Sequence, residues 1–147
     1  MNTTYVIRQT LDFAVARVVL REAWFGGKNR DNPHARWIAP TDDGKPWVIA
    51  DVPLAWIRPN EAGVLYDGTV NLERARAYAA AMPRIDVPVY LAFGPRMVAK
   101  GRTVAAVHDG GHRVTAARMR GDSMLHAIMR RRDLEQLASA HMALVQR

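Results

Sequence analysis

Cysteine is absent from this chain of 147 residues. Its absence excludes disulfide bonds, thiolate catalysis and zinc sites with cysteine ligands, and it is consistent with a reducing compartment. No apolar run approaches the roughly 20 residues that a bilayer-spanning helix needs. The polar start, residues 1–4, is not a charged region followed by an apolar one, so we expect no signal peptide and no membrane partner. We therefore expect a cytoplasmic protein whose chemistry uses carboxylates, histidines, hydroxyls or a bound metal.

Acidic residues are also scarce relative to basic ones, since 21 Lys and Arg face 14 Asp and Glu and give a formal net charge of +7. Residues 100–147 carry nine basic and four acidic groups, and most of the surplus lies there. A concentrated basic surplus is typical of proteins that meet phosphates, either in nucleotides or in nucleic acid. The alternative is that the charge serves only solubility.

Hydrophobic periodicity and turn residues predict one α+β domain without internal repeats. We expect residues 1–46 to form an N-terminal helix (10–25) and a long loop extension, and residues 47–147 to form the main domain. The main domain should begin with short strands within 47–57 that are broken at Pro53, followed by a helix over 72–82 capped by Asn71. Strands at 87–93 and 102–107 should then pair as a hairpin. A helix over 113–120 stopped by Gly121, a strand at 125–129 and a last helix capped by Asp133 should complete the domain.

The most informative segment is residues 107–118, where an apolar strand meets Gly110 and Gly111 and then His112 and Arg113 at the start of a helix. Glycines at such a turn let the backbone approach a ligand closely. The N–H groups at the start of a helix face outward with the positive end of the helix dipole. This turn is therefore predicted to bind an anion, most simply a phosphate.

Four segments in this order and spacing resemble the ParB/sulfiredoxin-like superfamily over residues 48–130. They are VPLAWIRPNE at 52–61, a helix with paired alanines, VPVYL at 87–91, and DGGHR at 109–113 followed by Ala116, Ala117, Arg118 and Gly121. The resemblance implies a compact mixed sheet with helices packed on it, and a glycine turn that binds the phosphates of a nucleotide or of nucleic acid. Members of the superfamily include partition proteins that bind CTP, DNA-cleaving and ATP-hydrolysing proteins of plasmids and phages, sulfiredoxins and small-molecule kinases.

Two departures from the superfamily pattern narrow the range of superfamily activities that we expect for this chain. Sulfiredoxins have a reactive cysteine immediately before the His-Arg pair, and Gly111 stands there in this chain, which excludes sulfinic-acid repair. About 17 residues follow the last expected strand, too few for the helix-turn-helix reader of partition proteins. We therefore expect a stand-alone ParB-like nuclease domain.

The candidate catalytic residues are His112, Asp109 and Glu61, and the candidate phosphate-binding residues are Gly110, Gly111, His112 and Arg113. Arg113 offers a fork of donors, and His112 offers a donor or a proton shuttle. Asp109 is the candidate ligand for Mg²⁺ or Mn²⁺, whereas the resemblance implies that Glu61 is the base of the kinase-like members. The structural alternatives are that Asp109 caps the turn, His112 packs in a half-buried wall and Glu61 is a solvated loop acid.

The candidate nucleic-acid-binding residues are Arg118, Arg130, Arg131 and Arg132, and a solvated basic surface is the alternative for the three consecutive arginines. His126 alternates within an apolar strand and is most simply a core or edge histidine. The resulting hypothesis is a DNA-binding or nucleotide-binding protein, with ATP or CTP as ligand and metal-dependent nuclease or NTP hydrolase activity. A non-catalytic regulator of a mobile element, a small-molecule kinase, and a homodimer or protein partner held through a terminal helix stay open.

Overall fold

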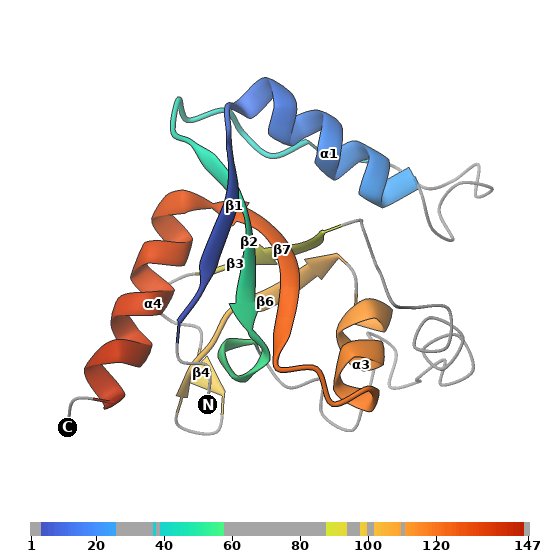
Figure 1. Cartoon of the computed structure of the whole chain (residues 1–147). Coiled ribbons are helices and arrows are strands. Elements are labelled where there is room, and N and C mark those ends of the chain that lie inside the picture. Colours follow the sequence, from blue (N-terminus) through green and yellow to red (C-terminus); the bar gives the residue numbers. More distant parts are fainter. Residues whose placement is uncertain are drawn as a thin grey trace.

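The computed structural model describes residues 4–25, 37, 39–57, 88–93, 98–99, 102–109 and 111–145. The helix expected over 72–82, Glu61 and Gly110 lie outside these residues. A five-stranded sheet in the order β1-β2-β7-β3-β6 forms the centre of the fold (Figure 1). Its strands are β1 (Val6–Leu11), β2 (Trp47–Pro53), β3 (Val89–Ala92), β6 (Ala106–Asp109) and β7 (Met124–Arg130).

The sheet is mixed. Strands β1, β2 and β7 are mutually antiparallel, β7 and β3 are parallel, and β3 and β6 are antiparallel. The other described elements are α1 (Phe13–Phe25), the short 3-10 helix η1 (Leu54–Trp56), α3 (Gly111–Met119), α4 (Arg131–Val145), and a separate ribbon of β4 (Val98–Ala99) with β5 (Arg102–Thr103). The expected α+β class is confirmed.

Side chains that alternate along β2 divide the core between the two faces of the sheet. On one face, Trp47 and Ile49 pack with Leu20 of α1. On the other face, Val48 and Ala50 belong to the cluster that includes residues of α3 and α4, among them Val114, Ala117, Leu134 and Leu137. Figure 1 shows α1 at the top of the view, with α4 at the left and α3 at the right. Burial of each large aliphatic side chain contributes about 1.5–3 kcal/mol to folding.

The N-terminal segment joins this same sheet. The sequence predicts a helix from residue 10, whereas residues 6–11 form β1, which pairs with β2 from Val6 opposite Asp51 to Leu11 opposite Trp47. The helix α1 begins only after Asp12, whose Oδ1 accepts the backbone N–H of Val15 at 2.9 Å. Asp12 is thus the N-cap that separates strand from helix.

The antiparallel pairing expected between the strands at 87–93 and 102–107 is seen between β3 and β6, with Leu91 opposite Val107. The single strand expected over 102–107 is wrong, because Arg102–Thr103 forms β5 and pairs with β4 instead. The expected break at Pro53 is also confirmed, because β2 ends there and η1 follows. The expected cap at Asp133 is wrong, since α4 already begins at Arg131. Asp133 lies in the first turn of α4, where it is buried and its carboxylate accepts the backbone N–H of Phe93.

Candidate functional site

The glycine turn is a tight connection between β6 and α3. Strand β6 ends at Asp109 and α3 begins at Gly111, so a single residue separates them. The first turn of α3 contains no acidic residue. The first N–H groups of any helix have no partner within the helix, and they carry the positive end of its dipole. The side chains of Asp109 and His112 lie outside the described residues, as does Gly110.

Arg113 lies in the first turn of α3 and reaches the start of β3. Its Nη1 donates a hydrogen bond to the carbonyl oxygen of Pro88 at 3.2 Å, in partly buried surroundings. Because Tyr90 in β3 is opposite Asp109 in β6, this contact lies at the same end of the sheet as the glycine turn. The Arg113 side chain therefore joins the start of α3 to the strand beside it.

Arg118 lies further along α3 and holds the end of η1. Its Nη2 donates to the carbonyl oxygen of Ile57 at 3.1 Å. Partial burial lowers the pKa of the Arg118 guanidinium from its ordinary value, because desolvation disfavours the charged form. Arg118 was expected to contact nucleic acid, and in the structure its side chain connects α3 to the segment after β2.

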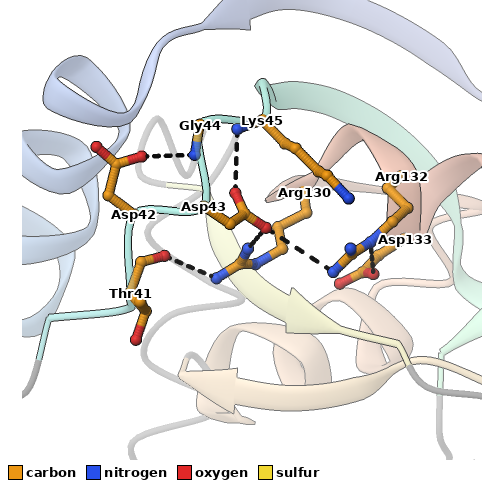
Figure 2. Close-up of polar contacts among 8 residues, drawn as sticks. All are labelled: Thr41, Asp42, Asp43, Gly44, Lys45, Arg130, Arg132 and Asp133. Carbon is orange, nitrogen blue, oxygen red and sulfur yellow. Dashed lines mark hydrogen bonds and ion pairs between the residues drawn. The ribbon is translucent and has the colours of Figure 1, made fainter.

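The three consecutive arginines at the junction of β7 and α4 have different surroundings, and Figure 2 shows two of them, Arg130 and Arg132. Arg130 points back toward the loop before β2, where it pairs with the carboxylate of Asp43 and donates to the carbonyl oxygen of Thr41 at 3.0 Å. Its guanidinium also lies 5.1 Å from the centre of the Trp47 ring. Arg130 therefore attaches the loop to the sheet.

Asp43 is the acceptor at the centre of this cluster. The pKa of Asp43 lies below its ordinary value. The largest cause is the hydrogen bond from the backbone N–H of Lys45. Burial raises this pKa, and the charges of Arg130 and Arg132 lower it further. Nη2 of Arg132 lies 3.9 Å from Oδ2 of Asp43, and Nε of Arg132 lies 3.8 Å from Oδ1 of Asp133. Arg131 instead pairs with Glu135 one helical turn later, at 3.1 Å. Arg131 and Arg132 remain about half exposed, at 45% and 48% of their side-chain surface, and are the members of this run that face solvent most.

A second polar cluster, not expected from the sequence, crosses three neighbouring strands. Asp51 in β2 accepts two hydrogen bonds through different oxygens: Oδ1 lies 3.0 Å from Nδ1 of His126 in β7, and Oδ2 lies 2.8 Å from Nε of Arg8 in β1. Burial alone would raise the pKa of Asp51, but the hydrogen bonds from His126 and Arg8 outweigh it and hold the pKa below its ordinary value. The carboxylate is therefore kept charged between two donors.

The only signal for this cluster in the sequence is one aspartate and one histidine at alternating positions within apolar strands. Asp51 follows Ile49 on the same face of β2, and His126 precedes Ile128 on the same face of β7. The register that places Asp51 opposite His126 joins residues 75 positions apart. The sequence offers no means of fixing that register.

An open groove lies at the end of the sheet opposite the β6–α3 turn, between the start of α1 and the loop before β2. Asp12, Asp42 and Lys45 are among its lining residues. Both carboxylates already accept backbone N–H groups, Asp12 from Val15 and Asp42 from Gly44. These two aspartates therefore order their own turns.

Of the site residues expected from the sequence, the structure places the backbone of Asp109 and Gly111 close to Arg113. The arginines at 130–132 lie at the other end of the sheet, where β7 ends. Within the described residues, no three His, Asp or Glu side chains gather as a metal-ligand set. No described helix is long and apolar enough to cross a membrane. Comparison with protein-family models, with curated proteins and with solved structures finds no match to this chain.

Proposed function

We propose that this protein binds the phosphates of a nucleotide or of nucleic acid at the turn between β6 and α3, as the resemblance to ParB/sulfiredoxin-like proteins implies. The observation that carries the proposal is the single-residue connection from Asp109 to Gly111, the first residue of α3. A helix that begins directly after a strand has its first N–H groups at the end of the sheet, and an anion can accept hydrogen bonds from such groups.

Two further features support a phosphate as the anion. The first turn of α3 carries Arg113 and no acidic residue, so nothing within it offsets the positive end of the dipole. The chain has a net charge of +7, with the surplus concentrated after residue 100. A polyanion therefore meets a favourable long-range field as well as local donors. The absence of cysteine agrees with a cytoplasmic site of action.

The proposed roles of the remaining site residues follow from the chemistry of their side chains. His112 adds a donor to the phosphate, and Asp109 and Glu61 are the carboxylates available for Mg²⁺ or Mn²⁺. A divalent ion supplies charge neutralisation for phosphate oxygens when it is bound. Arg131 and Arg132 are the proposed contacts for a longer nucleic-acid backbone.

Titration calorimetry with ATP, CTP and a short DNA duplex, each with Mg²⁺ and with EDTA, tests this proposal. Arg113→Ala should weaken binding about tenfold or more, because a charge-assisted hydrogen bond to phosphate contributes about 1.5–3 kcal/mol. Arg21→Ala, which removes the same charge from α1, is the matched control and should bind as the wild type does.

Thermal melting of both variants separates lost affinity from lost folding, since Arg113 also contacts Pro88. Equal affinities of the wild type and Arg113→Ala, or no binding of any of the three ligands, would reject a phosphate site at this turn.

A further inference from the structure

We infer that Arg132 and Lys45 bind the phosphodiester backbone of nucleic acid beside the junction of β7 and α4, and that Asp43 occupies this site when nucleic acid is absent. The inference rests on the proposed function for its ligand class. It adds Lys45 as a contact and Asp43 as an internal competitor of phosphate. The site lies at the opposite end of the sheet from the β6–α3 turn and uses none of the residues of that turn.

The carboxylate of Asp43 is enclosed by donors that would suit a phosphate equally well. Its Oδ2 pairs with Nη1 of Arg130 and lies 3.9 Å from Nη2 of Arg132. Its Oδ1 accepts the backbone N–H of Lys45 at 3.1 Å. Figure 2 shows both arginines converging on this one side chain. Two guanidinium groups that converge on an oxygen of a carboxylate offer the same donors to an oxygen of a phosphate.

The two arginines hold Asp43 in different ways. Arg130 is 19% exposed and also donates to the loop backbone, so it is the member that attaches the loop. Arg132 is 48% exposed, and its contacts with Asp43 and Asp133, at 3.9 and 3.8 Å, are longer than hydrogen bonds. Solvent screens such ion pairs, so they contribute little to stability. Arg132 can therefore exchange Asp43 for a stronger acceptor while Arg130 keeps the loop in place.

Lys45 adds a positive charge beside this cluster. Its backbone N–H binds Asp43, which holds the lysine close to the carboxylate. Its side chain is exposed, and among the described residues no hydrogen bond or ion pair of its ammonium group is found. Figure 2 shows this side chain extending from the loop on the side where Arg130 and Arg132 lie. The ammonium group is therefore available to a ligand that Arg132 also contacts.

Nucleic acid is a better fit to this surface than an anionic membrane. A peripheral membrane site combines basic side chains with apolar ones that enter the lipid. The large apolar side chains found exposed in the described part of the chain belong to β1, α1 and α3 and are Val6, Val15, Val18 and Met119. A basic surface without such side chains gains affinity for nucleic acid through the release of counterions. The net charge of +7 adds a favourable long-range field.

In the proposed exchange, a phosphodiester oxygen takes the place of Asp43 Oδ2 beside Arg132, and the Lys45 ammonium group approaches the same phosphate. Asp43 keeps its contacts with Arg130 and with the backbone of Lys45. No covalent bond is made or broken. The charge of Asp43 continues to repel the bound phosphate, so the affinity for nucleic acid should rise when that charge is removed.

Asp43→Asn tests the competition, with fluorescence anisotropy of a short labelled DNA duplex as the measurement. The variant should bind the duplex about fivefold more tightly than the wild type, the effect of one unit charge at roughly 4 Å in water. Asp42→Asn is the matched control, because Asp42 is the neighbouring aspartate and accepts the N–H of Gly44 in a similar turn without an ion pair to either arginine. It changes the net charge equally and should alter the affinity by less than about twofold, since salt screens more distant charges.

Arg132→Ala and Lys45→Ala test the contacts themselves. Each should weaken duplex binding and lower the slope of log affinity against log salt concentration by about 1, as the loss of one phosphate contact does. In Arg132→Ala, the added substitution Asp43→Asn should no longer raise the affinity, because the two residues act on one site. Thermal melting of every variant, with binding measured well below the transition, excludes unfolding as the cause.

The outcomes separate this inference from the proposed turn. Normal duplex binding by Arg132→Ala and Lys45→Ala, with loss of binding in Arg113→Ala, overturns the inference and supports the turn. The opposite pattern supports the inference and rejects the turn. Equal affinities of the wild type, Asp42→Asn and Asp43→Asn, or a gain in Asp43→Asn that persists without Arg132, overturn the competition. Binding to vesicles that contain anionic lipid, without binding of either protein form to the duplex, overturns nucleic acid as the ligand.

Discussion

Adjacent residues of one type have different roles in this chain. Arg130 and Arg131 are neighbours in the sequence, yet Arg130 pairs with Asp43 and covers Trp47, whereas Arg131 pairs with Glu135 on the surface of α4. A run of basic residues in a sequence does not distinguish these environments. The distinction comes from the end of β7, where the chain passes from strand to helix.

Arg130→Ala should lower the free energy of unfolding by about 1–2 kcal/mol, since a hydrogen bond to Thr41, a surface ion pair and a cation–π contact are lost. Arg131→Ala removes an exposed ion pair with Glu135, one helical turn away, and should lower the free energy of unfolding by no more than about 0.5 kcal/mol. Urea denaturation of the two variants measures the difference. Equal losses in both would mean that Arg130 does not attach the loop.

The partners of single residues were the least predictable part of the candidate site. The sequence allows His126 to be described as a core or edge histidine, and it is indeed partly buried in a strand. Its pairing with Asp51 depends on a ladder between segments 75 residues apart. Local spacing contains no information about that distance, so the cluster emerges only when the strands are placed.

Elements with strong local signals were predicted well. Gly121 was expected to stop the helix, and α3 ends in a Schellman motif there: the N–H of Gly121 bonds to the carbonyl of Arg118 and that of Asp122 to Ala117. Gly121 has φ of +72°, in the left-handed region. Strand β1 was missed because its residues continue the apolar spacing of α1, and Asp12 alone separates the two.

Gly121→Ala should lower the free energy of unfolding by about 1–2 kcal/mol, because a Cβ disfavours the left-handed conformation. Steric contact is not the cause, since a Cβ built there meets nothing within 4 Å. Gly121→Asn should cost less, because asparagine tolerates this conformation better. Thermal unfolding of the two variants provides the comparison, and equal stability of Gly121→Ala and the wild type would contradict the role of the turn.

For the whole molecule, the α+β class was predictable from the sequence but the strand order was not. The antiparallel pair of β3 and β6 joins segments separated by the ribbon of β4 and β5 alone, whereas the insertion of β7 between β2 and β3 joins distant parts of the chain. That insertion brings His126 beside the start of β3 and so to the end of the sheet where α3 begins. The pair of Asp51 and His126 is therefore a consequence of topology, and the proposed phosphate turn a consequence of local sequence.

The central claim is that phosphates bind to the backbone at the start of α3. An assigned amide nitrogen–proton NMR spectrum, recorded while ATP, CTP or a short DNA duplex is added, tests it directly. We expect the largest saturable shifts at the amides of Gly111, His112 and Arg113. Saturable shifts confined to other elements, with these three amides unchanged, would contradict the account.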